Sequence, residues 1–150
     1  MGYIDENLMN GEQVVHRSKL HWIVFLMPIA LIIIAFMYFA VGKETAPVGG
    51  FIFLIAIIWA VAAFISFKTS EFGVTNKRVL FKVGFIRRNS LETLLTKVEG
   101  IQVNQGIFGR IFNYGTIMVK GTGGTSNPFH KIEAPMDFRK KVQEQIAAIK

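Results

Sequence analysis

The sequence predicts a membrane α-helical hairpin joined to a small α+β domain, and three observations lead to this fold class. Two uncharged apolar segments of twenty residues each lie in the first half of the 150-residue chain. The residues that follow alternate apolar and polar side chains with a period of two, which is typical of half-buried strands. The last fifteen or so residues (about four turns) repeat apolar side chains at a four-residue spacing, which predicts an amphipathic helix.

The composition sets the chain apart from ordinary soluble domains. Hydrophobic residues make up 51% of the chain and charged residues only 18%, against about 25% charged in soluble domains. The chain has no cysteine, which excludes disulfide frameworks, structural cysteine–zinc sites, iron–sulfur clusters and thiol catalysis. The absence of cysteine also fits a reducing compartment.

Residues 22–41 and 48–67 are predicted to be two transmembrane helices. Neither segment contains a charged residue, and at about 1.5 Å per residue each is about 30 Å long, the thickness of the hydrocarbon core. Two buried helices of a soluble protein are disfavoured because no polar stripe interrupts either segment. A cleaved signal peptide fits the first segment poorly, since the apolar run is too long and a second one follows.

The predicted organisation is a cytoplasmic segment at residues 1–21, helices at 22–41 and 48–67, an external loop at 42–47 and a cytoplasmic domain at 68–150. Orientation follows from the basic residues near the ends of the helices. Two precede the first helix and four follow closely on the second, whereas the loop has one, Lys43. The positive-inside rule therefore places both termini in the cytoplasm.

Small residues form a strip on the second predicted helix, at Ala56, Ala60 and Ala63. Such strips let helices approach closely in a membrane. We expect this strip to pack against the first helix or, alternatively, against another subunit. Neither span contains a charged residue, so the sequence offers no intramembrane ion or proton site.

The cytoplasmic domain is predicted to be several antiparallel strands. In residues 78–83, Val79, Phe81 and Val83 share one face, while Arg78 and Lys82 point the other way. Further strands are expected at residues 70–75, 85–88, 97–105, 116–120 and 128–132, and the last is placed at a sheet edge because it contains a proline. Residues 99–100 suggest a β-bulge, and residues 106–112 a turn or partial helix.

A helix is predicted to end the chain. Pro135 suits a first helical position, and Phe138, Val142 and Ile146 recur at four-residue spacing. Strands followed by one amphipathic helix make a small α+β domain in which the helix covers an open end or edge of a curved sheet.

Several stretches resemble one known family. They are residues 68–84 (KTSEFGVTNKRVLFKVG), 97–101 (KVEGI), 111–116 (IFNYGT) and 121–124 (GTGG), with a Gly-Glu pair, Gly11-Glu12, before the first span. Together they resemble the bacterial pleckstrin-homology-like (PH-like) domain family, more narrowly its YdbS-like, membrane-flanked type. The most specific parts are residues 75–78 and 114–116. The resemblance implies an antiparallel β-sandwich or barrel capped by the C-terminal helix, and it implies no particular activity.

Candidate catalytic and metal sites are few. The three histidines, His16, His21 and His130, lack metal-ligand spacing such as HExxH, and neither a G-x-S-x-G motif nor a convincing carboxylate pair occurs. Residues 121–125 (GTGGT) are expected to be hairpin-turn residues, because strands flank them and no Lys-Ser/Thr follows as in a phosphate loop. We predict no enzymatic activity, no metal site and no cofactor.

The positive charge lies in the C-terminal part, where residues 68–150 carry 14 basic and 6 acidic side chains. Each Lys or Arg near an anionic leaflet contributes roughly 1 kcal/mol of attraction. One interpretation is a surface that binds anionic lipid headgroups, formed by Lys68, Lys77, Arg78, Lys82, Arg87 and Arg88. The alternative is that these residues only set topology. Nucleic acid is not expected as a partner, because the chain is held at a membrane and lacks interleaved exposed aromatics.

Two functions from different classes follow. The first is a multi-pass protein of the bacterial inner (cytoplasmic) membrane with both termini cytoplasmic, acting as a non-catalytic binding module that contacts the lipid bilayer and anionic phospholipid headgroups. The alternative is a protein-interaction or self-assembly scaffold. Exposed sheet edges accept an added strand, from a membrane-protein partner or from a second copy in a homo-oligomer.

Overall fold

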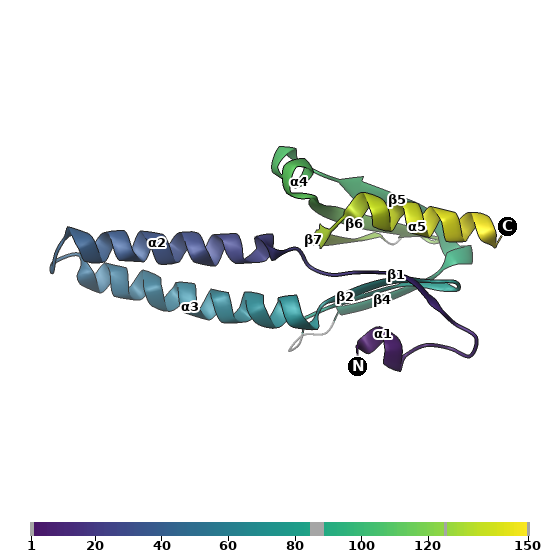
Figure 1. The fold of residues 1–150 in the computed structure, drawn as a ribbon, viewed down its shortest axis with the longest axis horizontal. Helices are drawn as coiled ribbons and strands as arrows, with labels where there is room; N and C mark the ends of the chain where they lie inside the picture. Colours follow the sequence, from purple (N-terminus) through teal and green to yellow (C-terminus); the bar gives the residue numbers. More distant parts are fainter. Residues whose placement is uncertain (1, 85–88, 125, 150) are drawn as a thin grey trace. The chain divides into compact units, whose positions relative to one another are not determined.

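The chain divides into two compact units. The computed structural model describes residues 2–84, 89–124 and 126–149. One unit consists of residues 22–68, and the other combines residues 1–21 with residues 69–150 (Figure 1). The second unit, called the domain below, is therefore interrupted in sequence by the first.

The first unit is a pair of apolar helices. A 3₁₀ turn, η1 (Trp22–Phe25), leads into α2 (Leu26–Val41), and α3 (Ala46–Thr69) follows. Both Trp22–Val41 and Ala46–Thr69 are long and apolar enough to cross a membrane. The two predicted spans are therefore helices, and α3 starts before residue 48 and ends after residue 67, so the link between the helices is shorter than predicted.

Small residues bring these two helices together. The buried residues of α3 are Gly49, Ala56 and Ala63, spaced seven apart, and Ala35 of α2 is fully buried. A Cβ atom on Gly49 would lie 3.0 Å from the carbonyl oxygen of Ala35. Close approach through small residues is the usual way in which membrane helices pack.

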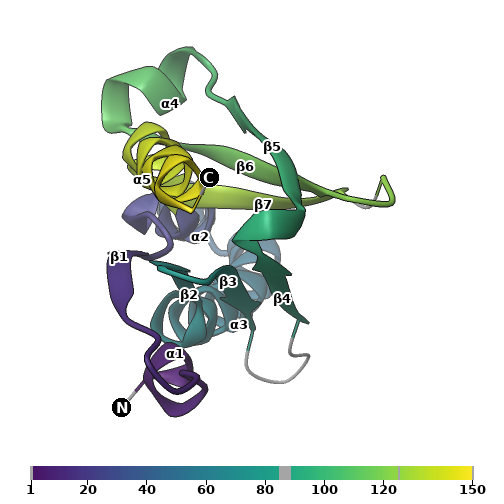
Figure 2. The same cartoon turned by 90° about the vertical axis from the view of Figure 1, so that its right-hand side faces the viewer.

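The domain contains two antiparallel sheets, which form two layers (Figure 2). Sheet A has the order β1-β2-β3-β4 and consists of β1 (Val14–Ser18), β2 (Glu71–Thr75), β3 (Arg78–Val83) and β4 (Asn89–Leu94). Sheet B has the order β5-β6-β7 and consists of β5 (Val98–Asn104), β6 (Tyr114–Gly121) and β7 (Ser126–Glu133). The predicted fold class is confirmed: apolar helices, antiparallel sheets and a C-terminal helix fit a membrane hairpin joined to a PH-like α+β domain.

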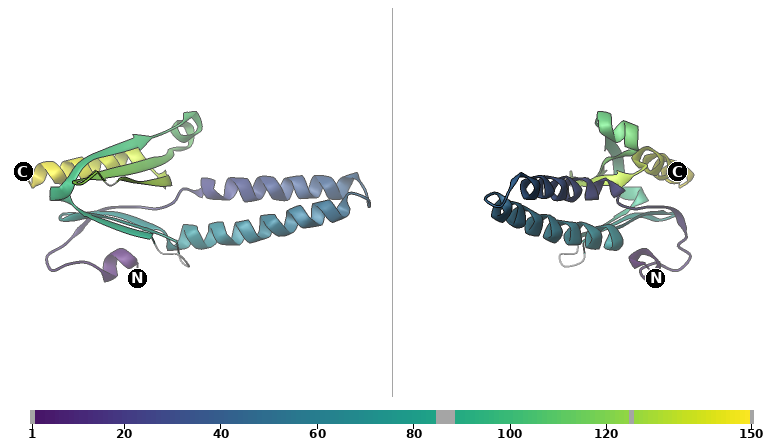
Figure 3. Two further views of the ribbon diagram at one scale, coloured as in Figure 1. Left: turned by 180° about the vertical axis from the view of Figure 1, so that it is seen from behind. Right: turned by 60° about the vertical axis from the view of Figure 1, so that its left-hand side comes forward.

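Four short or capping helices complete the domain: α1 (Tyr3–Glu6), η2 (Leu95–Lys97), α4 (Ile107–Phe112) and α5 (Pro135–Ala148). Helix α5 begins at Pro135 as predicted, and its residues Phe138 and Val142 are fully buried. It packs against strands of both sheets, β1 and β2 on one side and β5 and β6 on the other. Helices α1 and α5 lie on opposite sides of sheet A (Figure 3).

The core between the sheets is built from aromatic rings. Phe81 of β3 stacks on Phe129 of β7 with ring centroids 4.4 Å apart, and Phe72 of β2 meets Phe81 at 5.7 Å. Phe138 of α5 meets Phe81 at 5.4 Å. Offset and edge-on aromatic pairs of this kind stabilise a core beyond the burial of their area. Phe81 therefore joins both sheets and the C-terminal helix.

Strand β1 is the main element that the sequence analysis missed. Residues 1–21 were treated as a separate segment, whereas β1 pairs with β2, with Val14 opposite Thr75 and Ser18 opposite Phe72. The apolar helices are thus inserted between two neighbouring strands of one sheet. A five-residue strand whose partner lies more than fifty residues away leaves no local signal, which is why the periodicity did not reveal it.

The outer face of sheet A is also more buried than predicted. Arg78 and Leu80 are buried together with Val79 and Phe81, because the N-terminal segment covers this face. Ile4 of α1 is 1% exposed, and a Cβ atom on Gly73 would lie 2.6 Å from the Ile4 side chain. Gly73 therefore makes the space that Ile4 occupies.

The remaining strands follow the prediction with shifted bounds. β5 shows the expected irregularity between Val98 and Gly100, Ile117 and Val119 of β6 point inward and are buried, and β7, which contains Pro128, is an edge strand. Residues 106–112 contain the partial helix α4. The strand expected at residues 85–88 falls outside the described residues, and β4 follows it at Asn89–Leu94, a strand that was not predicted.

Candidate functional site

Both connections to the apolar helices leave the domain at one end. Ser18 and Phe72 are paired in sheet A, so the chain leaves β1 and returns to β2 at the same end of that sheet. Residues 19–21 then run along β7: the amide of His21 donates to the carbonyl oxygen of Lys131 (2.8 Å), and the amide of Glu133 donates to that of Lys19 (2.9 Å). We call this the tethered end.

The opposite end of the domain, called the far end, holds the β2–β3 turn at residues 76–77. The residue pairs in sheet B show which of its residues lie at the tethered end and which at the far end. Tyr114 pairs with Glu133 at the tethered end, and Gly121 pairs with Val98 at the far end. The loop after Gly121 and η2 therefore belong to the far end, whereas the β5–β6 connection with α4 belongs to the tethered end.

The six basic residues predicted to bind headgroups do not form one cluster. Lys68 is exposed in the last turn of α3. Lys82 lies at the tethered end of β3, opposite Glu71, with its Nζ atom 5.2 Å from the centroid of the Tyr3 ring. Lys77 lies in the turn at the far end, where its Nζ atom donates to the carbonyl oxygen of Asn10 (2.6 Å). Arg87 and Arg88 are outside the described residues.

Arg78 is buried, with 5% of its surface exposed. Its Nε and Nη2 atoms donate to the two carboxylate oxygens of Glu12 at 2.9 and 3.1 Å. Its Nη1 atom donates to Glu92, and Nη2 also donates to the carbonyl oxygen of Asn7. All three nitrogen atoms of the Arg78 guanidinium are therefore hydrogen-bonded within the domain.

Glu12 shares this buried position, with a side chain that is 0% exposed. Its carboxylate also accepts hydrogen bonds from the Thr75 hydroxyl (2.6 Å) and the Met9 amide (2.7 Å). Burial raises the pKa of Glu12, but the hydrogen bonds from Arg78, Met9 and Thr75 outweigh it and hold the pKa below its ordinary value. The hydrogen bond to Glu12 in turn raises the pKa of Arg78. Both groups are charged at neutral pH.

The motif at residues 75–78 thus locks the N-terminal segment onto sheet A. Asn76 adds two hydrogen bonds to this attachment: its side-chain carbonyl accepts from the Gln13 amide (2.9 Å), and its side-chain amide donates to the carbonyl oxygen of Gly11 (3.2 Å). Gly11 has a φ of 75°, a left-handed conformation that favours glycine. The Gly-Glu pair and the residue 75–78 motif, which the sequence analysis quoted as separate parts of one resemblance, are in contact and serve stability.

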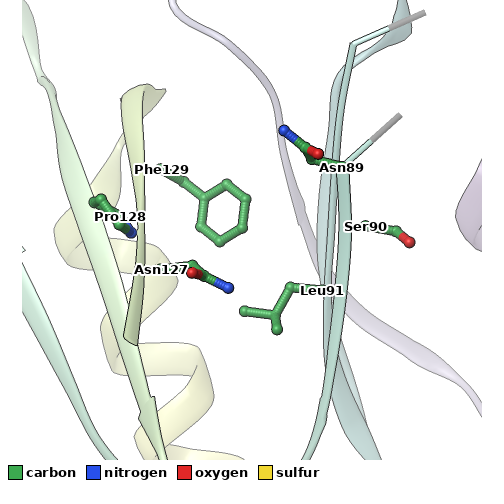
Figure 4. Close-up of a pocket in the computed structure, with 6 residues that line it drawn as sticks. All are labelled: Asn89, Ser90, Leu91, Asn127, Pro128 and Phe129. Carbon is green, nitrogen blue, oxygen red and sulfur yellow. The ribbon is translucent and has the colours of Figure 1, made fainter. Parts of the chain in front are cut away.

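An open groove lies between the edge strands β4 and β7, on the side of the sandwich that α5 does not cover. The pocket there has a volume of about 450 Å³. Figure 4 shows Leu91 of β4 pointing across it toward Asn127 and Phe129 of β7. Its lining residues carry no charge: Asn89, Ser90, Leu91, Asn127, Pro128 and Phe129.

The groove was not predicted, because it forms only where two edge strands face each other. In the described part of the chain, β4 has no partner strand beyond β3. The first half of β7 likewise pairs only with β6, since its contacts with residues 19–21 involve its last residues. Unpaired backbone donors and acceptors beside the Leu91 and Phe129 side chains suit an extended peptide.

The histidines lie apart. The His16 ring meets Phe138 at 6.1 Å, the His21 ring meets Tyr114 at 5.3 Å, and Nδ1 of His130 is hydrogen-bonded to the Thr116 hydroxyl (3.0 Å). Over residues 2–84, 89–124 and 126–149, no group of three or more histidine, aspartate or glutamate side chains is arranged to hold a metal ion. Two of the histidine rings pack against aromatic rings and the third is hydrogen-bonded.

The alanine strip of α3 lies largely inside the helix pair. Ala56 is 0% and Ala63 8% exposed, and Ala60 is half-buried. The first two side chains are occupied by packing within the chain. Contact with another subunit through this strip stays a prediction.

Comparison with known proteins gives one match. A family model described as "bacterial PH domain" matches residues 18–146. The matched range includes both apolar helices and all strands from β2 to β7. No curated protein and no solved structure matches the chain.

Proposed function

Because the chain belongs to the bacterial PH domain family, we propose that it is a non-catalytic binding module, anchored by its helix pair in the bacterial inner membrane with the domain on the cytoplasmic side. The length and apolar composition of both helices support the anchoring, and one observation carries the topology: the helices are inserted between β1 and β2, which are hydrogen-bonded neighbours. If both helices cross the bilayer, the strands on either side of them must share one compartment. The excess of basic residues next to the spans supports the cytoplasm as that compartment.

This orientation is tested by chemical labelling of single cysteines, for which the cysteine-free chain has no background. Glu44→Cys marks the exposed link between the helices, and Lys120→Cys marks the domain. A membrane-impermeant maleimide should label Glu44→Cys in intact spheroplasts and Lys120→Cys only in inverted vesicles. Labelling of both variants from the same side would contradict the proposal.

We further propose that the tethered end contacts anionic headgroups. Lys68 supports this because it lies in the last turn of α3, next to the connection to the domain. Lys82 supports it because it lies at the tethered end of β3. Arg87 and Arg88 lie outside the described residues and stay part of the sequence-based prediction. Arg78 and Lys77 are no longer part of the proposed surface, since the first is buried and the second lies at the far end. At roughly 1 kcal/mol per basic residue, the remaining residues provide a modest preference for anionic lipid.

The headgroup contact is tested with the full chain in nanodiscs of mixed neutral and anionic lipid, by counting retained lipids with native mass spectrometry. The variant Lys68→Glu/Lys82→Glu should lose retained anionic lipid and its salt dependence. Lys97→Glu/Lys120→Glu makes the same change of charge with exposed residues at the far end and should behave as the unmodified chain. Equal behaviour of the two variants would mean that the basic residues only set topology.

A protein-interaction scaffold is the second candidate, and the β4–β7 groove favours it. We propose an extended peptide segment of a membrane-protein partner as its occupant, since strand edges bind extended backbone through main-chain hydrogen bonds. A photo-crosslinking side chain at Asn127 should give one discrete protein adduct in cells, and Leu91→Glu, which places a charge in the groove, should abolish it. An adduct insensitive to Leu91→Glu would rule out the groove as the binding site.

A further inference from the structure

Helix α4 presents an unusual surface for a domain of this size. Its sequence from Ile107 to Phe112 is IFGRIF, and its four large apolar side chains are exposed: Ile107 by 79%, Phe108 by 68%, Ile111 by 67% and Phe112 by 42%. Adjacent exposed apolar groups of this kind mark a surface that another phase or molecule covers. The sequence predicts a turn or partial helix at residues 106–112 and gives no sign of this surface.

The exposure follows from how α4 packs. Its buried residue is Gly109, where a Cβ atom would lie 2.6 Å from the carbonyl oxygen of Tyr114. The helix therefore meets the domain through its own backbone, and the Ile107, Phe108 and Ile111 side chains project outward. The glycine is required by this close approach.

The helix is also held firmly in this orientation. The side-chain amide of Gln105 donates to the carbonyl oxygens of Tyr114 (3.1 Å) and Gly109 (3.4 Å). Asn113 ends the helix in a left-handed conformation, with its amide bonded to Gly109, and its carbonyl oxygen accepts from the Ala134 amide (3.0 Å). An apolar surface displayed on a fixed scaffold is pre-organised for insertion into a partner phase.

The position of α4 identifies that phase. Asn113 lines one pocket together with Ser18, Ser70 and Glu133, all at the tethered end. Lys19, whose carbonyl oxygen accepts from Glu133, is only three residues from Trp22, the first residue of an apolar span. Three extended residues reach at most about 10 Å, so chain connectivity keeps α4 close to the surface of any membrane that the helices cross.

The charge pattern agrees with a lipid surface. Arg110 is the only charged residue between Gln105 and Gly115, and it lies among the apolar side chains. An arginine beside aromatic and aliphatic residues matches the boundary between anionic headgroups and acyl chains, where apolar faces insert by about 5–10 Å.

From these observations we infer that α4 is an interfacial anchor, whose Ile107, Phe108, Ile111 and Phe112 side chains insert into the cytoplasmic leaflet of the bilayer that the helix pair spans. The inference rests on the proposed anchoring and adds a third attachment, formed by the domain itself.

The test uses the full chain in lipid vesicles, with an environment-sensitive fluorophore on single cysteines. Phe108→Cys reports on α4, Ile58→Cys on the exposed face of α3, and Thr122→Cys on the far end. Lipids carrying a nitroxide quencher near the headgroup or deep in the acyl chains measure depth. We expect shallow quenching and a blue-shifted emission for Phe108→Cys, deep quenching for Ile58→Cys and neither effect for Thr122→Cys.

Each other outcome is decisive. If Ile58→Cys is quenched while Phe108→Cys behaves as Thr122→Cys does, the inference is wrong and the proposed anchoring stands. If Ile58→Cys is not quenched either, the anchoring is wrong and the inference falls with it. If Phe108→Cys is shielded from water but unquenched by lipid, and the shielding depends on protein density, a second copy covers α4 instead.

A variant series separates insertion from folding. Ile107→Ser/Ile111→Ser, placed in the Phe108→Cys background, should reduce the shallow quenching, and the fold should persist because these side chains are exposed. Leu94→Ser removes an equally apolar side chain that is 41% exposed at the far end and should leave the quenching unchanged. Equal quenching in both variants would overturn the inference.

Discussion

Replacing Arg78 with alanine should detach the N-terminal segment from the domain. Arg78→Ala would leave the Glu12 carboxylate, whose side chain is 0% exposed, buried without its cation and without two of its hydrogen bonds. Removing one partner of a buried ion pair costs about 3–5 kcal/mol. Glu92 contributes little to this cost, since its side chain is 37% exposed and exposed pairs are worth about 0–1 kcal/mol.

The assay is hydrogen exchange measured by mass spectrometry on the full chain in nanodiscs. At 1.36 kcal/mol per factor of ten, the expected loss corresponds to roughly two to four orders of magnitude in the protection of amides in residues 1–18 and in β2. Glu12→Gln should produce a comparable loss, because it leaves the Arg78 guanidinium buried without its anion.

The matched control is Arg17→Ala. Arg17 also forms an arginine–carboxylate pair, but its partner, Asp5, lies in the same N-terminal segment, and the two side chains are 48% and 39% exposed. This change should leave the protection of β1 and β2 nearly unaltered. If Arg78→Ala lowers protection by no more than Arg17→Ala does, the buried pair does not hold the segment and the argument is refuted.

Three further predictions follow from the same structure. The free energy of unfolding should fall as the pH drops below 4.5, the ordinary pKa of a glutamate. The folded-state pKa of Glu12 is lowered, so its stabilising contribution is present above pH 4.5 and is lost as the carboxylate protonates. Thermal unfolding measured against pH should show this slope in the unmodified chain and a weaker slope in Glu12→Gln. Residues 69–150 alone should fail to give a cooperative unfolding transition, because they lack β1 and Glu12. A chain in which a short turn joins residue 20 to residue 70 retains both and should fold in the absence of detergent. Cooperative folding of both chains would contradict the role given to β1. Ala56→Leu should weaken the packing of α2 on α3, at a cost of about 1–3 kcal/mol for overpacking. The detergent-solubilised chain should then denature more easily, whereas Ile58→Leu on the exposed face of α3 should leave its denaturation unchanged.

The elements that the sequence predicted are those with a local repeat. The alternation in residues 78–83 identified β3, and Phe138 and Val142 identified α5, because periods of two and of four residues report directly on a buried face. Two uncharged segments of helical length identified the helix pair in the same way.

The features that escaped prediction depend on contacts between distant residues. Glu12 and Arg78 are 66 positions apart, so an arginine close to a predicted span was interpreted as a headgroup ligand although it is a buried structural residue. One signal was present: Val79, Leu80 and Phe81 are three consecutive apolar residues, which indicates a strand covered on both faces. The groove carried no such signal, since Leu91 and Asn127 are unremarkable until two edge strands face each other.

If the helix pair crosses a membrane, its insertion between β1 and β2 couples topology to folding. Residues 1–21 are made before the two apolar helices, and their partner strands β2 and β3 are made after them. Because this segment carries only two basic residues, Arg17 and Lys19, positive charge alone resists its transfer across a membrane only weakly. Its pairing with β2 and the buried Glu12–Arg78 contact favour the arrangement in which residues 1–21 and β2 are on the same side of the membrane. With residues 1–21 on the opposite side, β2 would be an uncovered edge and Arg78 would lack its carboxylate partner. The domain therefore folds completely only in the topology in which both ends of the helix pair face the same compartment.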